Sequence, residues 1–127
     1  MARVKGANTR PEMEVRRKAF AAGFRFRLHA KFLPGRPDLI FPRYRVAVFI
    51  HGCFWHGHNC NRGKRPTTNV EFWNTKLDRN LTRDEEKLRE LTAAGWETII
   101  VWQCRLKTDT EALLKLLADH RSREFTK

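Results

Sequence analysis

The sequence contains only three cysteines, one tyrosine and no long hydrophobic segment. Its longest uninterrupted apolar run covers residues 46–50, whereas a membrane-spanning helix needs roughly 20 such residues. The first residues also lack the apolar core of a secretory signal peptide. An odd number of cysteines does not suit a disulfide framework, and disulfides are rare in the cytoplasm. We therefore expect a cytoplasmic protein without a membrane partner, in which the cysteines have another role.

Acidic residues are also few, because 14 Asp and Glu stand against 26 Lys and Arg, which gives a formal net charge of +12. A positive charge of this size on a small domain favours binding to the phosphate backbone of nucleic acid, since neutralised phosphates release counterions. An RNA-binding or ribosomal protein and a lipid-surface binder are alternatives that composition leaves open. Hydrophobic residues make up 41% of the 127, which is enough for a core. We expect a single domain over residues 1–127.

The first half of the chain has clear patterns for a helix and a hairpin. A helix is expected from about residue 10 to 22, with Thr9 as its N-cap and Glu12 closing a capping box. Alternating apolar residues predict a strand at 24–28. Two apolar runs at 38–41 and 46–50 flank a turn, and together they predict an antiparallel hairpin in which Asp38 lies opposite Ile50.

The second half adds helices and one more strand. Helices are expected at 69–94, with a candidate break near Asn80, and at 109–120. The run at 98–102 has no polar interruption after Thr98, which favours a buried strand at the centre of the sheet. This order of elements predicts an α/β fold with a mixed central sheet flanked by helices.

Asp38 follows Pro37 at the start of a predicted strand, where strand propensity disfavours aspartate. A local rule that is broken at one position commonly indicates function. In the expected hairpin the carboxylate lies beside a main-chain carbonyl and the imidazole of His51, and such oxygens suit Mg²⁺. An aspartate that only caps a turn at the strand end is the alternative.

The loop at residues 51–66 is rich in glycine, asparagine, histidine and cysteine. Cys53, His58 and Cys60 lie within eight residues of one another there, and Cys104 follows the predicted strand at 98–102. Three thiolates and one imidazole form a closed, tetrahedral zinc set of the structural kind, which stabilises a loop that has no core of its own. Free buried cysteines with surface histidines are the alternative. It is weaker because one zinc site accounts for all three cysteines.

Four further residues of this loop are candidates for function. His56 lies between expected zinc ligands, so its position is fixed, and a neutral imidazole can accept a proton from water. His51 is the other histidine left over, and either histidine can instead be a surface residue. Phe54 and Trp55 are large apolar side chains on a polar loop, and such rings can insert between base pairs; packing under the loop is the alternative. Basic residues that flank these loops are candidates for phosphate contacts: Arg3, Lys5, Arg10, Arg43, Arg45, Arg62, Lys64 and Arg65.

Several strings together resemble those of the very short patch repair endonucleases. They are Gly35-Arg36-Pro37-Asp38, Phe49-Ile50-His51-Gly52-Cys53-Phe54-Trp55-His56, His58, Cys60 and Val101-Trp102-Gln103-Cys104. The resemblance covers about residues 1–120, and the His-Gly-Cys-Phe-Trp-His string is highly specific. It implies a restriction-endonuclease-like fold with a structural zinc loop. It also implies a Mg²⁺-dependent nickase that cuts double-stranded DNA 5′ to the thymine of a T:G mismatch, where 5-methylcytosine has been deaminated. Because a single asymmetric mismatch does not demand a symmetric dimer, we expect a monomer. Mismatch-repair proteins are further candidate partners.

The resemblance also implies a role for each matched residue. Asp38 would bind Mg²⁺ together with the main-chain oxygen of Ile50. His56 would be the general base that activates water, His51 would assist near the phosphate, and Glu12 would support the histidine. The remaining matched residues would be the zinc ligands and the intercalating wedge: Cys53, His58, Cys60 and Cys104 for zinc, and Phe54 and Trp55 for the wedge. For Glu12, the capping-box role and the catalytic role both stay open.

The sequence departs from the usual pattern in three respects. Gly57 and Asn59 stand where some relatives carry a His-rich stretch, which removes spare imidazoles but no matched ligand. The second acidic residue and the lysine of restriction-like sites are absent from the strand that ends at Ile50, where the resemblance implies a main-chain metal ligand instead. Relatives also carry an additional N-terminal segment, so the expectation is that either the start of this chain is truncated or its arm, residues 1–9, is short. Two other functions remain open: a zinc-stabilised nuclease of this fold with another DNA target, and a module that binds distorted DNA without cutting it. The bases read around the mismatch depend on groove contacts, which spacing does not indicate.

Overall fold

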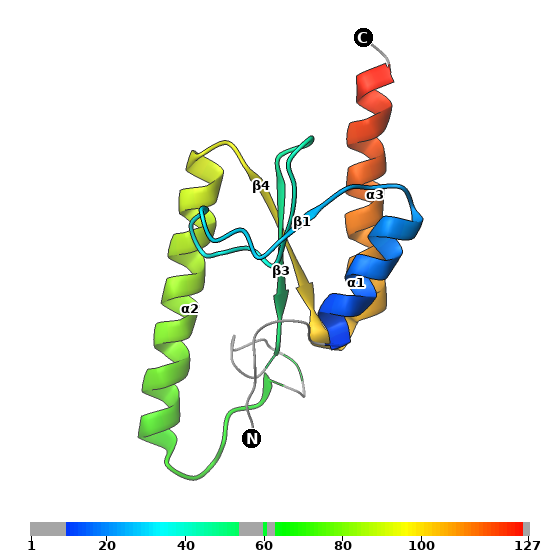
Figure 1. Cartoon of the computed structure of the whole chain (residues 1–127). Helices are drawn as coiled ribbons and strands as arrows, with labels where there is room; N and C mark the ends of the chain where they lie inside the picture. Colours follow the sequence, from blue (N-terminus) through cyan, green and yellow to red (C-terminus); the bar gives the residue numbers. More distant parts are fainter. Residues whose placement is uncertain (1–9, 54–59, 61–62, 126–127) are drawn as a thin grey trace.

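The computed structural model describes residues 10–53, 60 and 63–125 (Figure 1). The order of elements is helix, three strands, helix, strand, 3₁₀ turn and helix. Their bounds are α1 Arg10–Ala21, β1 Arg27–Leu28, β2 Leu39–Phe41, β3 Val46–His51, α2 Val70–Ala93, β4 Glu97–Trp102, η2 Gln103–Arg105 and α3 Leu106–Phe125. Within this part of the chain, none of the helices has the length and apolar character needed to cross a membrane.

The four strands form one mixed sheet in the order β1-β2-β3-β4. The β1–β2 and β2–β3 pairs are antiparallel, whereas β3 and β4 are parallel. A parallel pair needs a crossover connection, and α2 supplies it. The expectation of a mixed sheet flanked by helices is confirmed, but the expected central position of the strand at 98–102 is wrong. β4 is an edge strand of the described sheet, and its apolar run is explained by α2 and α3, which both pack against it.

Helices cover the sheet on both faces, with α2 on one side and α1 and α3 on the other (Figure 1). Alternate residues of the strands therefore enter two cores. The core beneath α1 and α3 contains Val15, Ala19, Phe24, Leu39, Phe41, Val46, Val48, Val101, Leu113 and Leu117. The core beneath α2 contains Ala30, Ile40, Ala47, Phe49 and Leu91. Burial on both faces explains why the strand sequences are almost continuously apolar.

The hairpin forms as expected, but its register differs by one residue. Phe41 pairs with Val46 and Leu39 with Val48, one residue away from the expected partners, and the Asp38 N–H donates to the Val48 carbonyl. The reason is the four-residue connection 42–45, in which Arg45 adopts a positive φ of 56°. A turn that pairs Asp38 with Ile50 would be centred on residue 44, whereas the loop 42–45 has its centre between residues 43 and 44. This difference of half a residue shifts the partner of each strand residue by one position.

Several element boundaries also differ from the sequence expectations. The strand expected at 24–28 is reduced to Arg27–Leu28, because Phe24 is buried against the ring of Tyr44 and under the guanidinium of Arg121 instead of joining the ladder. α2 continues through Asn80 without a break. The last helix is longer than expected, from Leu106 to Phe125. The expected N-cap, Thr9, lies outside the described residues.

Candidate active site and cysteine cluster

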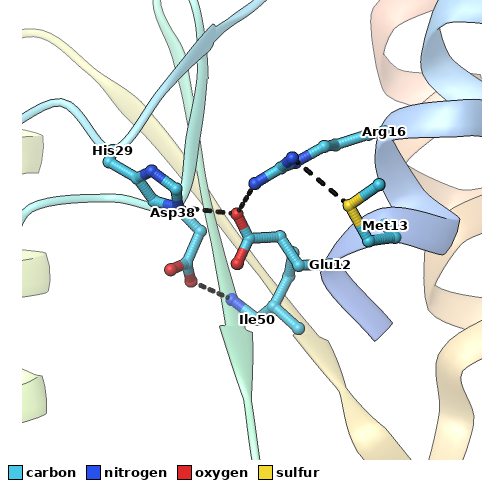
Figure 2. A network of polar contacts seen from close by, with 6 residues as sticks. All are labelled: Glu12, Met13, Arg16, His29, Asp38 and Ile50. Atoms are coloured by element: carbon cyan, nitrogen blue, oxygen red, sulfur yellow. Dashed lines mark hydrogen bonds and ion pairs between the residues drawn. The ribbon is translucent and has the colours of Figure 1, made fainter. Parts of the chain in front are cut away.

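Asp38 lies at the start of β2, where three strands come together. Its main-chain N–H donates to the Val48 carbonyl at 3.0 Å, and its carbonyl accepts the N–H of His29 at 2.9 Å. Its side-chain Oδ2 accepts a 2.7 Å hydrogen bond from the main-chain N–H of Ile50 (Figure 2). The backbone of Asp38 is therefore part of the sheet, and its carboxylate is held over the neighbouring strand. This arrangement differs from the alternative in which Asp38 only caps a turn.

Glu12 approaches Asp38 from α1. Its carboxylate oxygen Oε2 lies 2.7 Å from Nε2 of His29 and also pairs with the guanidinium of Arg16 (Figure 2). Only 1% of the Glu12 side chain is exposed. Glu12, His29 and Asp38 each offer one atom that can bind a metal ion, and these three atoms lie within 4.8 Å of one another. Carboxylates this close together suit a hard cation such as Mg²⁺, which prefers oxygen ligands. An inward-facing, buried Glu12 favours a role in this site over a helix cap alone.

An open hollow of about 260 Å³ lies beside Asp38 on the α2 side of the sheet. Besides Asp38 it is lined by Gly35, Arg36, Phe49, Ile50, His51, Asp84, Lys87 and Leu88. The structure therefore adds a carboxylate, Asp84, and an ammonium group, Lys87, that sequence analysis missed. β3 contains neither an acidic residue nor a lysine, but α2 brings Asp84 and Lys87 to the same hollow. The only signal in the sequence was their spacing of three, which places both residues on one face of a helix.

The loop before Asp38 gives this hollow its shape. Gly35 and Arg36 both have positive φ, at 77° and 50°. A Cβ atom on Gly35 would lie 3.0 Å from Cβ of Lys87 and 3.2 Å from Cζ of Phe49. Glycine is therefore required at this position both by the backbone conformation and by the close approach of α2.

His51 ends β3 and lines the same hollow as Asp38, so the structure brings these two predicted residues together. The His51 side chain is buried, and its ring lies 5.2 Å from the Trp102 ring in an edge-on arrangement and 5.8 Å from the Phe49 ring. Ile50 contacts Asp38 through its amide N–H, while the role of its carbonyl as a metal ligand stays a prediction. Four other predicted site residues lie outside the described residues: Phe54, Trp55, His56 and His58.

The three cysteines form one cluster at the C-terminal ends of two neighbouring strands. Cys53 follows β3 and Cys104 lies in η2 after β4, and the parallel pairing of these strands brings both residues to the same edge. The Sγ atoms of Cys53, Cys60 and Cys104 lie within 4.8 Å of one another. Two sulfurs on one tetrahedral zinc, each about 2.3 Å from the metal, are roughly 3.8 Å apart. The cluster therefore fits zinc, and the expectation that the three cysteines share one site is confirmed.

The protonation of Cys53 depends on its burial and on the two neighbouring cysteines. Burial, followed by the neighbouring thiols of Cys104 and Cys60, raises the pKa of the Cys53 thiol to about 11, although a hydrogen bond from the Cys104 backbone acts in the opposite direction. A group with such a pKa stays protonated at neutral pH unless a cation stabilises the thiolate. A bound metal ion supplies that charge.

Not all of the basic residues expected near the functional loops lie there. Arg43 and Arg45 belong to the turn between β2 and β3, at the opposite end of β3 from His51. Arg45 lies over the Trp96 ring and donates to the Ala94 carbonyl, so the expectation that these two arginines flank the site is wrong. Their position follows from the length of β3, which separates the hairpin turn from the site.

Arg65 joins the segment after the cysteine loop to α2. Its guanidinium donates to Oδ1 of Asn74 at 3.0 Å and to Oδ1 of Asp78 at 2.9 Å. These contacts fix the end of the loop that contains Cys60 against the first turns of α2.

Comparison with known proteins gives a consistent result. The family description "DNA mismatch endonuclease Vsr" matches residues 1–62. The chain is 48% identical to the type II nicking enzyme V.XorIIP of Xanthomonas oryzae pv. oryzae over 84% of this chain and 78% of the relative. It is 43% identical to the type II nicking enzyme V.NmeAIP of Neisseria meningitidis over 84% of this chain and 76% of the relative. It is also 43% identical to the DNA mismatch endonuclease Vsr of Escherichia coli, over 76% of this chain and 65% of that protein.

Proposed function

The chain belongs to the Vsr family of DNA mismatch endonucleases, and from this membership we propose that it nicks one strand of double-stranded DNA at a T:G mismatch. The cut falls 5′ to the mismatched thymine, depends on Mg²⁺, and starts very short patch repair of a deaminated 5-methylcytosine. The observation that carries the proposal is the position of Asp38, whose carboxylate is held by the Ile50 amide beside Glu12 and at the edge of the hollow that contains His51.

In this proposal Asp38 holds the catalytic cation, with the Ile50 carbonyl as a second ligand. When Mg²⁺ is bound there, it polarises the scissile phosphate and stabilises the charge on the leaving oxygen. Glu12 is held in place by Arg16 and His29, so its buried carboxylate adds negative charge on the α1 side of the site.

Histidines and a lysine then act on the water and the phosphate. His56 accepts a proton from the attacking water, since a neutral imidazole is basic enough near neutral pH. His51 lies in the hollow and contacts the phosphate. Lys87 lines the hollow from α2, and its ammonium group offsets the negative charge that the phosphate gains as the bond breaks.

The remaining predicted residues serve structure and recognition. Cys53, His58, Cys60 and Cys104 hold a structural zinc ion, which fixes the loop that contains His56. Phe54 and Trp55 enter the duplex as a wedge, which a weakened T:G pair admits more easily than a matched pair. A single asymmetric mismatch needs one active site, so we expect the enzyme to act as a monomer. Mismatch-repair proteins are candidate partners.

A second candidate function is supported by the relatives that are named type II nicking enzymes. Under this alternative the same site nicks a different DNA target. Two duplexes of identical sequence context, one with a T:G pair and one with C:G at that position, distinguish the two functions. Our proposal predicts Mg²⁺-dependent nicking of the T:G duplex alone. Equal nicking of both duplexes would rule out mismatch specificity while leaving the nuclease activity intact.

A further inference from the structure

We propose that His29 is a positioning residue, which fixes the Glu12 carboxylate relative to Asp38. The inference rests on the proposed function insofar as it concerns the active site. His29 was not among the site residues expected from the sequence. In the structure it contacts both acidic residues, with its side chain on Glu12 (Figure 2) and its main chain on Asp38.

The first observation is the backbone of His29. It follows the last residue of β1 and adopts a left-handed conformation with φ of 47°. Its N–H still donates to the Asp38 carbonyl at 2.9 Å, and the next N–H, of Ala30, donates to the Pro37 carbonyl at 3.1 Å. The chain therefore stays attached to β2 on both sides of an unfavourable conformation. A non-glycine residue held in such a conformation by its surroundings is commonly found at a functional site.

The second observation is the origin of the groups that hold Glu12. Arg16 lies four residues after Glu12 on α1, so their ion pair moves with the helix and does not fix the carboxylate relative to the sheet. His29 comes from the sheet edge, so its 2.7 Å contact with Oε2 joins α1 to the strand that carries Asp38. A carboxylate that is only 1% exposed needs such partners to offset its lost hydration.

The third observation concerns the ring nitrogen through which His29 contacts Glu12. Its Nε2 faces the Glu12 oxygen, and in this arrangement the N–H donates to the carboxylate. A ring nitrogen that carries this hydrogen is not available to bind a cation. Through this nitrogen His29 acts on Glu12, and the proposal assigns it no bond to the cation. A glutamine side chain also offers an N–H donor, whereas leucine has a similar volume and no donor.

The test compares His29→Gln and His29→Leu with a matched control. His120 forms a pair of the same residue types with Glu97, with Nε2 2.8 Å from Oε1, at the opposite end of the sheet, so His120→Leu removes a more exposed His–Glu pair far from Asp38. Each variant is measured for Mn²⁺ affinity by electron paramagnetic resonance, with Mn²⁺ as the probe, and for thermal unfolding. The single-turnover rate of nicking a T:G duplex is measured as well.

We expect His29→Leu to lower Mn²⁺ affinity and the nicking rate by about 10- to 100-fold, as is usual when a group that orients an active-site carboxylate is removed. His29→Gln should stay within about threefold of the unsubstituted protein, and His120→Leu should leave both quantities unchanged. If His29→Gln loses as much Mn²⁺ affinity as His29→Leu, His29 is a direct ligand and the proposal is wrong. It is also wrong if His29→Leu leaves both quantities unchanged.

The design separates this inference from the proposed function. Mn²⁺ affinity needs no DNA, so it tests the role of His29 even if the unsubstituted protein does not nick a T:G duplex. Such a failure would contradict the proposed substrate alone. A loss of thermal stability in His29→Leu without rescue by His29→Gln would instead indicate a purely structural residue.

Discussion

The main-chain N–H of Ile50 donates a 2.7 Å hydrogen bond to Oδ2 of Asp38, so the carboxylate at the start of β2 is held by the strand beside it. One carboxylate oxygen is thereby oriented, and the direction of the other follows from the geometry of the group. A fixed acceptor of this kind favours cation binding, because little side-chain freedom is lost when the ion arrives. The same contact makes Asp38 the most direct position at which to test the proposed chemistry.

We predict that Asp38→Asn abolishes nicking but leaves the fold intact. Asparagine keeps an oxygen that can accept the Ile50 N–H, whereas it lacks the charge that binds Mg²⁺. Changes to groups behind metal ligands cost about 10- to 100-fold in activity, so loss of the ligand itself should exceed about 100-fold. Single-turnover nicking, zinc content and the thermal midpoint are measured together. Nicking at the original rate would contradict the assignment of Asp38.

A separate prediction concerns Lys87, which lines the hollow beside Asp38 from α2. Lys87→Met removes the charge but keeps most of the side-chain volume. We expect the single-turnover rate to fall by about 10-fold, because the phosphate loses a cation as its negative charge grows. Lys107→Met on the exposed side of α3 is the matched control. If Lys87→Met lowers DNA affinity but leaves the single-turnover rate unchanged, Lys87 acts in DNA binding alone.

The cysteine cluster gives a prediction on metal removal. Cys104→Ser, or treatment with a strong chelator, should release zinc and lower the thermal midpoint by roughly 10 °C or more, because the loop after β3 loses its main stabilising contact. Asp38→Asn is the control and should keep its zinc. Atomic absorption and a thermal melt measure both effects. Full thermal stability after complete zinc loss would indicate that the ion is not structural.

The pKa of Cys53 determines how zinc binding depends on pH. The thiol has a pKa of about 11 in the metal-free cluster, and it must lose its proton to bind zinc. Zinc affinity should therefore rise as pH rises from 6 to 8, and zinc uptake should release protons. Calorimetric titrations in buffers with different ionisation enthalpies measure this release. Zinc affinity that does not change over this range would contradict thiolate coordination.

Gly35→Ala should destabilise the protein without changing any charged group. The substitution places a Cβ 3.0 Å from Cβ of Lys87 at a residue with φ of 77°. We expect a loss of about 1–3 kcal/mol in the free energy of unfolding. Gly52→Ala is the matched control, since no atom of the described residues lies within 4 Å of its added Cβ. Denaturant unfolding of both variants checks the difference, and equal stability would contradict the close approach of α2.

Much of the architecture could be predicted from the sequence because its patterns are local. The hairpin, the helix at α2 and the common site of Cys53, Cys60 and Cys104 follow from spacing and composition. The register was wrong by one residue, since the expected pairing of Asp38 with Ile50 centres the turn on residue 44, whereas the loop 42–45 has its centre between residues 43 and 44. Small changes in a turn shift every partner along the strand.

The missed residues of the site have a different cause. Asp84 and Lys87 reach the hollow because α2 turns one particular face toward the sheet, and helical spacing alone does not indicate which exposed or half-buried positions lie over a strand end. His29 directly follows the alternating segment 24–28, and its spacing alone places it on the polar side of a strand. Its contact with Glu12 depends on a left-handed turn and on a helix 17 residues earlier, which are tertiary features.

The parallel pairing of β3 and β4 also constrains how this protein can change during evolution. His51 of the hollow and Cys53 of the metal cluster are separated by one residue, and both are placed by the same strand. Insertion or deletion of a single residue between them would move one group out of its site whenever the other stays in place. We therefore expect homologous sequences to keep the length of this segment fixed.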